Sequence, residues 1–184
     1  MIPRFDPTRA VVFDLAQGQL RDDEGIHRLN VPVDALLRLA EAAGPDALRD
    51  FGQSLGSEVG RRVLRRLGDV AAGASTEAWV EHVGGELALV GLGNLSAERW
   101  GRVLVLAVAN APVGAEALLA SVVEGALQRA LGREVSAVSL ARGGETLRLA
   151  ILNRRAAERA REWQNEGASW VQILERLHDA RGEA

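Results

Sequence analysis

Three glycines recur at four-residue intervals within a segment whose remaining residues indicate a long helix. Gly52, Gly56 and Gly60 therefore lie along one stripe of the helix predicted for residues 45–67. Each glycine weakens an isolated helix by about 1 kcal/mol relative to alanine, so a contact in the folded protein must offset this cost. Small residues let another surface approach the backbone closely. That surface is a second helix, which is the ordinary case, a dimer partner or an elongated apolar ligand.

A second patch of small residues lies on the helix predicted for residues 75–92. It consists of Gly84, Gly85, Ala88 and Gly91, and we expect this helix to face the glycine stripe. Together the two patches predict an apolar cleft for a small molecule or lipid, unless the helices meet directly and the cleft is sealed core. The predicted cleft residues are Gly52, Leu55, Gly56, Val59, Gly60, Gly84, Leu87, Ala88 and Gly91.

Hydrophobic periodicity divides the chain into helices and strands. The apolar run at 102–110 is typical of a strand covered on both faces, and paired glycines at 143–144 indicate a hairpin turn. Strands are expected over 11–16, 26–31, 102–110, 134–140 and 146–152, and helices over 33–43, 45–67, 75–92, 115–131 and most of 153–184. The predicted fold class is α+β, with four main helices packed on an antiparallel sheet.

The chain is expected to have three parts: an N-terminal β-ribbon (1–32), an α+β core domain (33–152) and a C-terminal helical extension (153–184). The extension is polar, yet it carries two of the four tryptophans. Large aromatic side chains bury against something, either the body of the protein or another chain. We predict that the extension binds a partner protein through Arg155, Arg159, Trp163, Trp170, Ile173, Leu174 and Leu177.

Two groups of ionisable residues have an ordinary and a functional interpretation. A basic band ends the helix at 45–67 and consists of Arg61, Arg62, Arg65 and Arg66. This band is either a solvated face or a docking surface for an acidic partner. His82 and Glu86 lie four residues apart and are either a solvated pair on a helix or half of a metal site. Because the sequence offers no full ligand set, we predict no metal.

The segment from Gly52 to Gly56 matches the G-x-S-x-G pattern of hydrolase nucleophile elbows, with Ser54 as the serine. Such a serine lies on a strained turn between a strand and a helix. Here the pattern lies inside a helical segment that no strand precedes. A serine hydrolase is therefore a disfavoured alternative, and we predict no catalytic residues.

Composition excludes several other chemistries. All 22 basic residues are arginine and cysteine is absent, so lysine-dependent phosphate loops, Schiff-base catalysis and thiol catalysis are excluded. A formal net charge of −3 argues against a nucleic-acid partner, and no cofactor is predicted. The charged residues near Met1 and the lack of a long apolar segment predict no signal peptide, no membrane span and a cytoplasmic location.

Several motifs follow one another in an order found in a known group of proteins. A strand that ends in Asn-Ser-Pro-type residues leads there to a glycine-containing helix and a two-stranded hairpin. The matching residues here are Asn110-Ala111-Pro112, Gly125 and Leu131-Gly132-Arg133. Over residues 33–152 the chain thus resembles the vinyl-reductase/TRAPP-subunit superfamily, which implies helices packed around an antiparallel sheet.

The resemblance also implies a class of function. Members of that superfamily bind small or hydrophobic molecules, sense ligands for transcription regulators or form dimeric units of trafficking complexes, and few are catalysts. This chain lacks the cysteines of many members, which puts metal binding and acyl attachment in doubt. We expect a non-catalytic, homodimeric regulatory or adaptor module that binds an apolar small molecule or lipid and an unidentified protein. A ligand-free, TRAPP-like interaction scaffold is the alternative.

Overall fold

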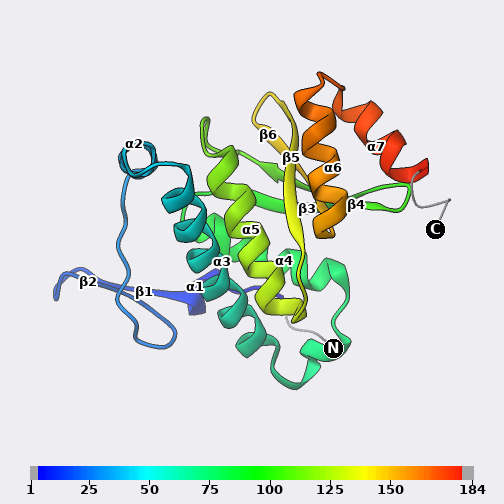
Figure 1. Cartoon of the computed structure of the whole chain (residues 1–184). Coiled ribbons are helices and arrows are strands. Elements are labelled where there is room, and N and C mark those ends of the chain that lie inside the picture. Colours follow the sequence, from blue (N-terminus) through cyan, green and yellow to red (C-terminus); the bar gives the residue numbers. More distant parts are fainter. Residues whose placement is uncertain (1–3, 180–184) are drawn as a thin grey trace.

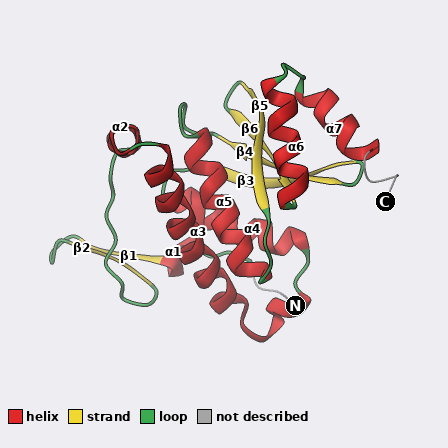
Figure 2. Cartoon of the chain, viewed as in Figure 1, coloured by secondary structure: helices red, strands yellow, loops and turns green. Residues whose placement is uncertain are grey.

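The computed structural model describes residues 4–179, which form a four-stranded antiparallel sheet covered by helices on both faces (Figures 1 and 2). The predicted α+β fold class is confirmed. In chain order the elements are α1 (Pro7–Ala10), β1 (Val11–Asp14), β2 (Gln19–Asp22), α2 (Val33–Ala43), α3 (Pro45–Leu67), the 3-10 helix η1 (Gly68–Gly73), α4 (Thr76–Leu89), β3 (Asn94–Trp100), β4 (Val103–Ala109), α5 (Glu116–Leu131), β5 (Ser136–Gly143), β6 (Thr146–Leu152), α6 (Arg154–Asn165) and α7 (Trp170–Asp179).

The sheet has the strand order β3-β4-β6-β5, with all neighbours antiparallel. Its central strand β4 is the apolar run read from the sequence, and it is buried because helices cover both faces. Edge strand β3 was not predicted. It reads Asn-Leu-Ser-Ala-Glu-Arg-Trp and buries only Leu95, so it lacks the alternating apolar pattern that identifies a strand.

Each face of the sheet has its own hydrophobic core. On one face Leu106, Val108 and Leu149 pack with side chains of α3, α4 and α5. On the other face Val105 and Ala150 pack with side chains of α6 and α7. Alternate residues of one strand therefore enter different cores, as the two-residue period of a strand requires.

Several helix ends lie where the sequence predicted them, with identifiable caps. Gly44 has a φ of 93° and ends α2, and Pro45 occupies the first turn of α3. The Ser75 side chain accepts a hydrogen bond from the Ala78 N–H at the start of α4, and Asn153 accepts one from Ala156 at the start of α6.

The second strand of the N-terminal ribbon is formed by different residues from the predicted ones. Its second strand is Gln19–Asp22 and not residues 26–31, because Leu15 to Gly18 already form the turn. Residues 26–28 instead run back along the outer edge of β2. The Asp22 N–H donates to the Ile26 carbonyl at 3.0 Å, and the Arg28 N–H donates to the Leu20 carbonyl at 2.8 Å.

No helix within residues 4–179 combines the length and the apolar content needed to cross a bilayer.

Candidate functional site

The glycine stripe of α3 packs directly on α5. A Cβ atom added to Gly52 would lie 2.6 Å from the Ser121 Cβ, and one added to Gly60 would lie 2.5 Å from the Ala126 carbonyl oxygen. A Cβ on Gly56 would overlap the Val122 carbonyl oxygen. The stripe therefore serves helix–helix packing, the ordinary alternative of the sequence analysis.

The predicted cleft between the two small-residue patches is therefore wrong. The stripe faces α5 and not α4, while Val59 and Leu87 are core residues and Leu55 is half-buried. The patch on α4 has other neighbours: Gly84 packs on Leu95 of β3, and Gly85 contacts the Phe5 ring. Ala88 and Gly91 are exposed and line no cleft with α3.

An apolar pocket of about 330 Å³ lies elsewhere, between η1, the start of α4, strands β4 and β6, and the end of α5. The side chains that line it are apolar, with Thr76 and Arg133 as the exceptions. The lining residues are Ala71, Ala72, Ala74, Thr76, Trp79, Val80, Leu104, Leu106, Leu127, Ala130, Leu131, Arg133, Val135 and Ile151.

Short side chains keep this apolar pocket open. Ala71 and Ala72 of η1 and Ala74, which caps its C-terminal end, form one wall, and Ala130 adds another methyl group from α5. Facing them are the larger side chains of Trp79 and the sheet, so the alanines leave space that longer side chains would fill. The sequence analysis assigned no role to residues 68–74, which lie between two predicted helices. Their small side chains opposite an apolar strand were the available signal.

A buried carboxylate lies two turns after Trp79 on α4. Glu86 is 0% exposed and forms ion pairs with Arg62 and Arg66 of α3 and with Arg28. The Arg62 Nη2–Glu86 Oε2 distance is 2.7 Å, and the Arg28 Nη2 atom lies 3.4 Å from the same oxygen. Burial would raise the pKa of Glu86, but the charges and hydrogen bonds of Arg62 and Arg66 outweigh it and lower the pKa.

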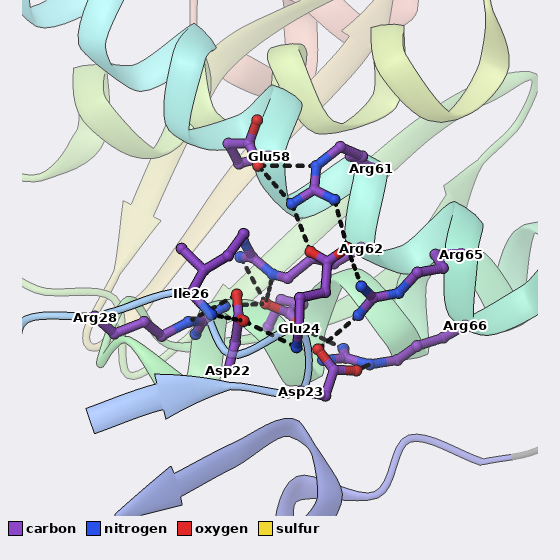
Figure 3. Close-up of polar contacts among 11 residues, drawn as sticks. Asp22, Asp23, Glu24, Ile26, Arg28, Glu58, Arg61, Arg62, Arg65 and Arg66 are labelled. Carbon is purple, nitrogen blue, oxygen red and sulfur yellow. Dashed lines mark hydrogen bonds and ion pairs between the residues drawn. The ribbon is translucent and has the colours of Figure 1, made fainter. Parts of the chain in front are cut away.

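The acidic turn that follows β2 pairs with Arg66 and with two further arginines of α3 (Figure 3). Asp23 pairs with Arg65 at 2.6 Å and with Arg66 at 3.2 Å. Glu24 pairs with Arg61 at 2.7 Å and also contacts Arg65. We call the ion-paired residues of α3, α4 and residues 22–28 the charge cluster. Its members are Asp22, Asp23, Glu24, Arg28, Glu58, Arg61, Arg62, Arg65, Arg66 and Glu86.

The charge cluster corrects two interpretations of the sequence. The basic band is neither a plain solvated face nor a free docking surface, because an acidic turn of the same chain covers it. His82 and Glu86 are not a solvated pair, since they are 2% and 0% exposed. Among the described residues, no three His, Cys, Asp or Glu side chains gather at metal-binding distance.

The C-terminal helices pack on the protein's own sheet. Ile173, Leu174 and Leu177 are buried in the core that β4 and β6 share with α6, so these residues are not available to a partner protein. Trp170 is half-buried and contacts Trp100 edge-on, with 5.1 Å between the ring centroids.

On α6, Arg159 lies over the half-buried Trp163 ring at 4.9 Å. Arg155 is exposed. The predicted partner surface is thus reduced to the polar outer side of α6, because its apolar members serve the core.

Ser54 is exposed in the middle of α3. The strand-to-helix turn of a nucleophile elbow is absent from this place, so the matching motif is a helix segment.

A second cleft, of about 790 Å³, runs beside edge strand β5 and is bordered by α5 and α6. Side chains cover part of the outward edge of β5. Glu124 accepts from the Ala137 N–H at 3.1 Å and from Gln53 at 2.9 Å, and Gln128 donates to the Val135 carbonyl at 2.8 Å. These polar groups form hydrogen bonds with one another and with the backbone at β5. The main role of the cleft residues is therefore to cover this edge of the sheet.

Comparison with known proteins identifies a shared fold but no family. No protein-family description matches the sequence, and no curated protein matches it significantly. Solved structures do match. One of them is the phenol-responsive sensory domain of the transcription activator PoxR, in a crystal structure with phenol. The TM-score is 0.59 at 13% sequence identity, and the alignment covers 79% of this chain and 86% of that chain. The two proteins share a fold.

Proposed function

We propose that this protein is a regulatory module that binds a small, uncharged, largely apolar molecule in the pocket between η1, α4 and the sheet. The observation that carries the proposal is the pocket itself: about 330 Å³ of space with an apolar lining and few polar groups. Ligand pockets of proteins have this character and begin at about this size. The fold shared with a phenol-responsive sensory domain supports the same class of function.

The chemistry of the lining limits the class of ligand that the pocket can bind. Removing apolar surface from water contributes about 25 cal/mol per Å², so Trp79, Leu106 and Leu127 favour an apolar ring or short chain. Thr76 and Arg133 offer hydrogen bonds for one polar substituent. Among residues 4–179 no acidic side chain lines the pocket, so the lining favours a neutral molecule over a cationic amine. A one- or two-ring neutral molecule suits this volume better than the lipid chain considered from the sequence.

A regulatory role requires that ligand binding in the pocket affect another part of the protein, and α4 connects the pocket to the charge cluster. Trp79 lies at the pocket and Glu86 lies seven residues later in the charge cluster. Because seven residues are close to two helical turns, both side chains belong to similar sides of α4. A ligand that shifts α4 therefore acts on the ion pairs that hold the turn after β2.

The proposal is tested by binding of phenol, toluene and naphthalene to the purified full chain, measured by calorimetry and thermal shift. We expect at least one probe to bind and to raise Tm, because a ligand that binds only the folded state stabilises it. Ala130→Leu fills the pocket and should abolish binding. Ala117→Leu is the matched control, since Ala117 lies exposed on the same helix outside the pocket.

The alternative is a ligand-free interaction scaffold. Failure of all three probes, or equal binding to the Ala130→Leu protein, would overturn the proposed pocket and favour the scaffold. Native mass spectrometry of gently purified protein gives a second readout, because a co-purified small molecule adds its mass to the chain.

A further inference from the structure

Side chains cover the β5 edge of the main sheet along only part of its length. β5 is an outer strand of the four-stranded sheet, and Figure 1 shows it between α5 and α6. Because these two helices pack on opposite faces of the sheet, they form two walls of the cleft of about 790 Å³ beside this edge. A further strand in this cleft would therefore have a helix on each face, as β4 has.

Two backbone groups of β5 point into the cleft without a partner. The Ala137 N–H donates to Glu124 at 3.1 Å and the Ser139 carbonyl accepts from Gln164, so both residues direct backbone groups away from β6. In an antiparallel ladder the N–H and C=O groups of one residue point to the same side. The Ala137 carbonyl and the Ser139 N–H therefore also face the cleft. In the described part of the chain neither group has a hydrogen-bond partner.

The free acceptor and the free donor match one residue of an added parallel strand. In a parallel pair, one residue donates to the carbonyl that precedes the residue opposite it and accepts from the N–H that follows that residue. Here those groups belong to Ala137 and Ser139, which flank Val138. An antiparallel strand would instead need both groups of Ala137 or both groups of Ser139. Glu124 and Gln164 already occupy one group of each.

Neighbouring side chains imitate a parallel strand two residues earlier along the same edge. Gln128 donates to the Val135 carbonyl at 2.8 Å, and Glu124 accepts from the Ala137 N–H. Together these two side chains supply the donor and the acceptor that one residue of a parallel strand would supply opposite Ser136. The cover therefore stops where the next bonding residue of such a strand would lie.

We propose that the cleft beside β5 binds an extended peptide segment of a partner protein. The segment runs parallel to β5, with an acidic residue opposite Val138 and an apolar residue on each side of it. Addition of a strand to an open sheet edge is a common mode of peptide recognition, in which backbone hydrogen bonds give affinity and alternate side chains give specificity.

Charge on the α6 side of the cleft favours the acidic residue. The side chain opposite Val138 would lie on the face of the sheet that α6 covers, because Val138 belongs to the core on that face. Arg161 of α6 lines the cleft there, is exposed and has no ion pair within residues 4–179. An acidic side chain would complement this charge.

The acidic residues of the lining leave the charge of Arg161 available. Glu158 pairs with Arg154 at 3.1 Å, and Glu116 pairs with Arg142 at 2.6 Å. Glu124 is hydrogen-bonded to the edge, and Glu134 precedes β5.

The α5 side of the cleft favours apolar neighbours. Residues before and after the acidic one would point to the opposite face of the sheet. Short side chains of α5 line the cleft on that face, together with Leu48 of α3; they are Ala117, Ala120 and Ser121. Ala120 and Leu48 also pack against the core of this face. These short side chains leave space for the apolar side chains of a peptide.

The test uses the full chain and the synthetic peptide acetyl-Thr-Val-Glu-Leu-Thr-amide, followed by amide NMR spectroscopy. The Ser139 N–H should exchange quickly in the free protein, and we expect the peptide to slow this exchange at least about tenfold, because it supplies an acceptor. A peptide N-methylated at its glutamate cannot donate to the Ala137 carbonyl. It should bind about tenfold more weakly, as expected for one lost hydrogen bond.

Charge reversal tests the acidic position separately. Arg161→Glu should weaken binding of the glutamate peptide by about fivefold, since an exposed attraction becomes a repulsion. A peptide with arginine in place of glutamate should bind this variant more tightly than it binds the wild type. Arg155→Glu is the matched control, because Arg155 lies exposed on the same helix and outside the cleft lining. Equal effects of the two substitutions would overturn the assigned acidic residue.

Three other results would overturn the proposal. They are no binding of the glutamate peptide at millimolar concentration, equal binding of the N-methylated peptide, and protection of Ser139 that develops without peptide as the protein concentration rises. The last result would assign the edge to a second copy of the chain. The test is independent of the proposed small-molecule binding, since among residues 4–179 only Val135 lines both the cleft and the apolar pocket.

Discussion

At the scale of single residues, the most consequential side chain is the carboxylate of Glu86. It is fully buried, and two arginines of α3 and Arg28 share its two oxygen atoms. Burying a charge is costly unless partners replace water, and here the partners come from two separate parts of the chain, α3 and the segment with Arg28. Glu86 therefore holds α3, α4 and the segment after the ribbon in one arrangement.

Replacement of Glu86 by Gln should lower the free energy of unfolding by about 3 kcal/mol, because loss of one partner leaves buried arginine charges uncompensated. Urea denaturation monitored by circular dichroism measures the change. Glu77→Gln is the control. Glu77 pairs with Arg99 at 3.5 Å in a largely exposed position, and its loss should change stability by less than about 1 kcal/mol.

The contribution of Glu86 should depend on pH in a defined direction. Its pKa in the folded protein is lowered from the ordinary value of 4.5, so the folded state favours the charged carboxylate. The stabilisation is fully present above pH 4.5 and is lost as the pH falls through the lower, folded-state pKa. Urea curves at pH 7 and at successive values below about 4.5 should therefore show the wild type losing its advantage over Glu86→Gln. An advantage that stays constant throughout this range would contradict the assignment.

At the scale of elements, the contact between α3 and α5 organises the helical layer. Its close approach depends on glycines from both helices, because Gly125 of α5 packs on the Gln53 backbone in the same way that Gly56 packs on Val122. The four-residue spacing in the sequence predicted a close approach but not which helix makes it. Small residues on α4 were equally suitable, so the spacing alone could not identify α5 as the neighbour of the stripe.

Gly56→Ala should therefore destabilise the protein even though alanine favours a helix. The propensity gain is about 1 kcal/mol, while the new methyl group collides with backbone atoms that cannot rotate away. Overpacking of this kind costs about 1 to 3 kcal/mol or more, so a lower Tm is expected in thermal unfolding. At Gly73 an added Cβ meets nothing within 4 Å, so Gly73→Ala should leave Tm nearly unchanged. A Tm equal to or above that of wild type for Gly56→Ala would refute the tight contact.

At the scale of the whole molecule, local signals predicted the elements and distant contacts decided their partners. The apolar run of β4, the Gly44-Pro45 boundary and the Gly143-Gly144 hairpin all depend on neighbouring residues, and each was read correctly. The charge cluster joins residues 22–28 to α3 and α4, and no periodicity encodes such a pairing. The pocket depends in the same way on η1 meeting the sheet.

The second core packs the C-terminal helices on the sheet, whereas the sequence analysis predicted that they bind a partner protein. A chain shortened to residues 1–152 loses Ile173, Leu174 and Leu177, and it exposes Val105 and Ala150 of the central strands to water. Full burial of each large aliphatic side chain contributes about 1.5 to 3 kcal/mol, so the loss is comparable to the roughly 5 to 15 kcal/mol that stabilises an ordinary domain.

We therefore expect the chain of residues 1–152 to aggregate or to lack cooperative thermal unfolding, as measured by light scattering and circular dichroism. A chain of residues 1–179 is the control and should unfold like the full protein, since it keeps every described residue of both cores. A cooperative transition in the shorter chain, at a Tm near that of the control, would show that α6 and α7 are dispensable for folding. The apolar side of these two helices would then be free to bind another protein, as the sequence analysis predicted.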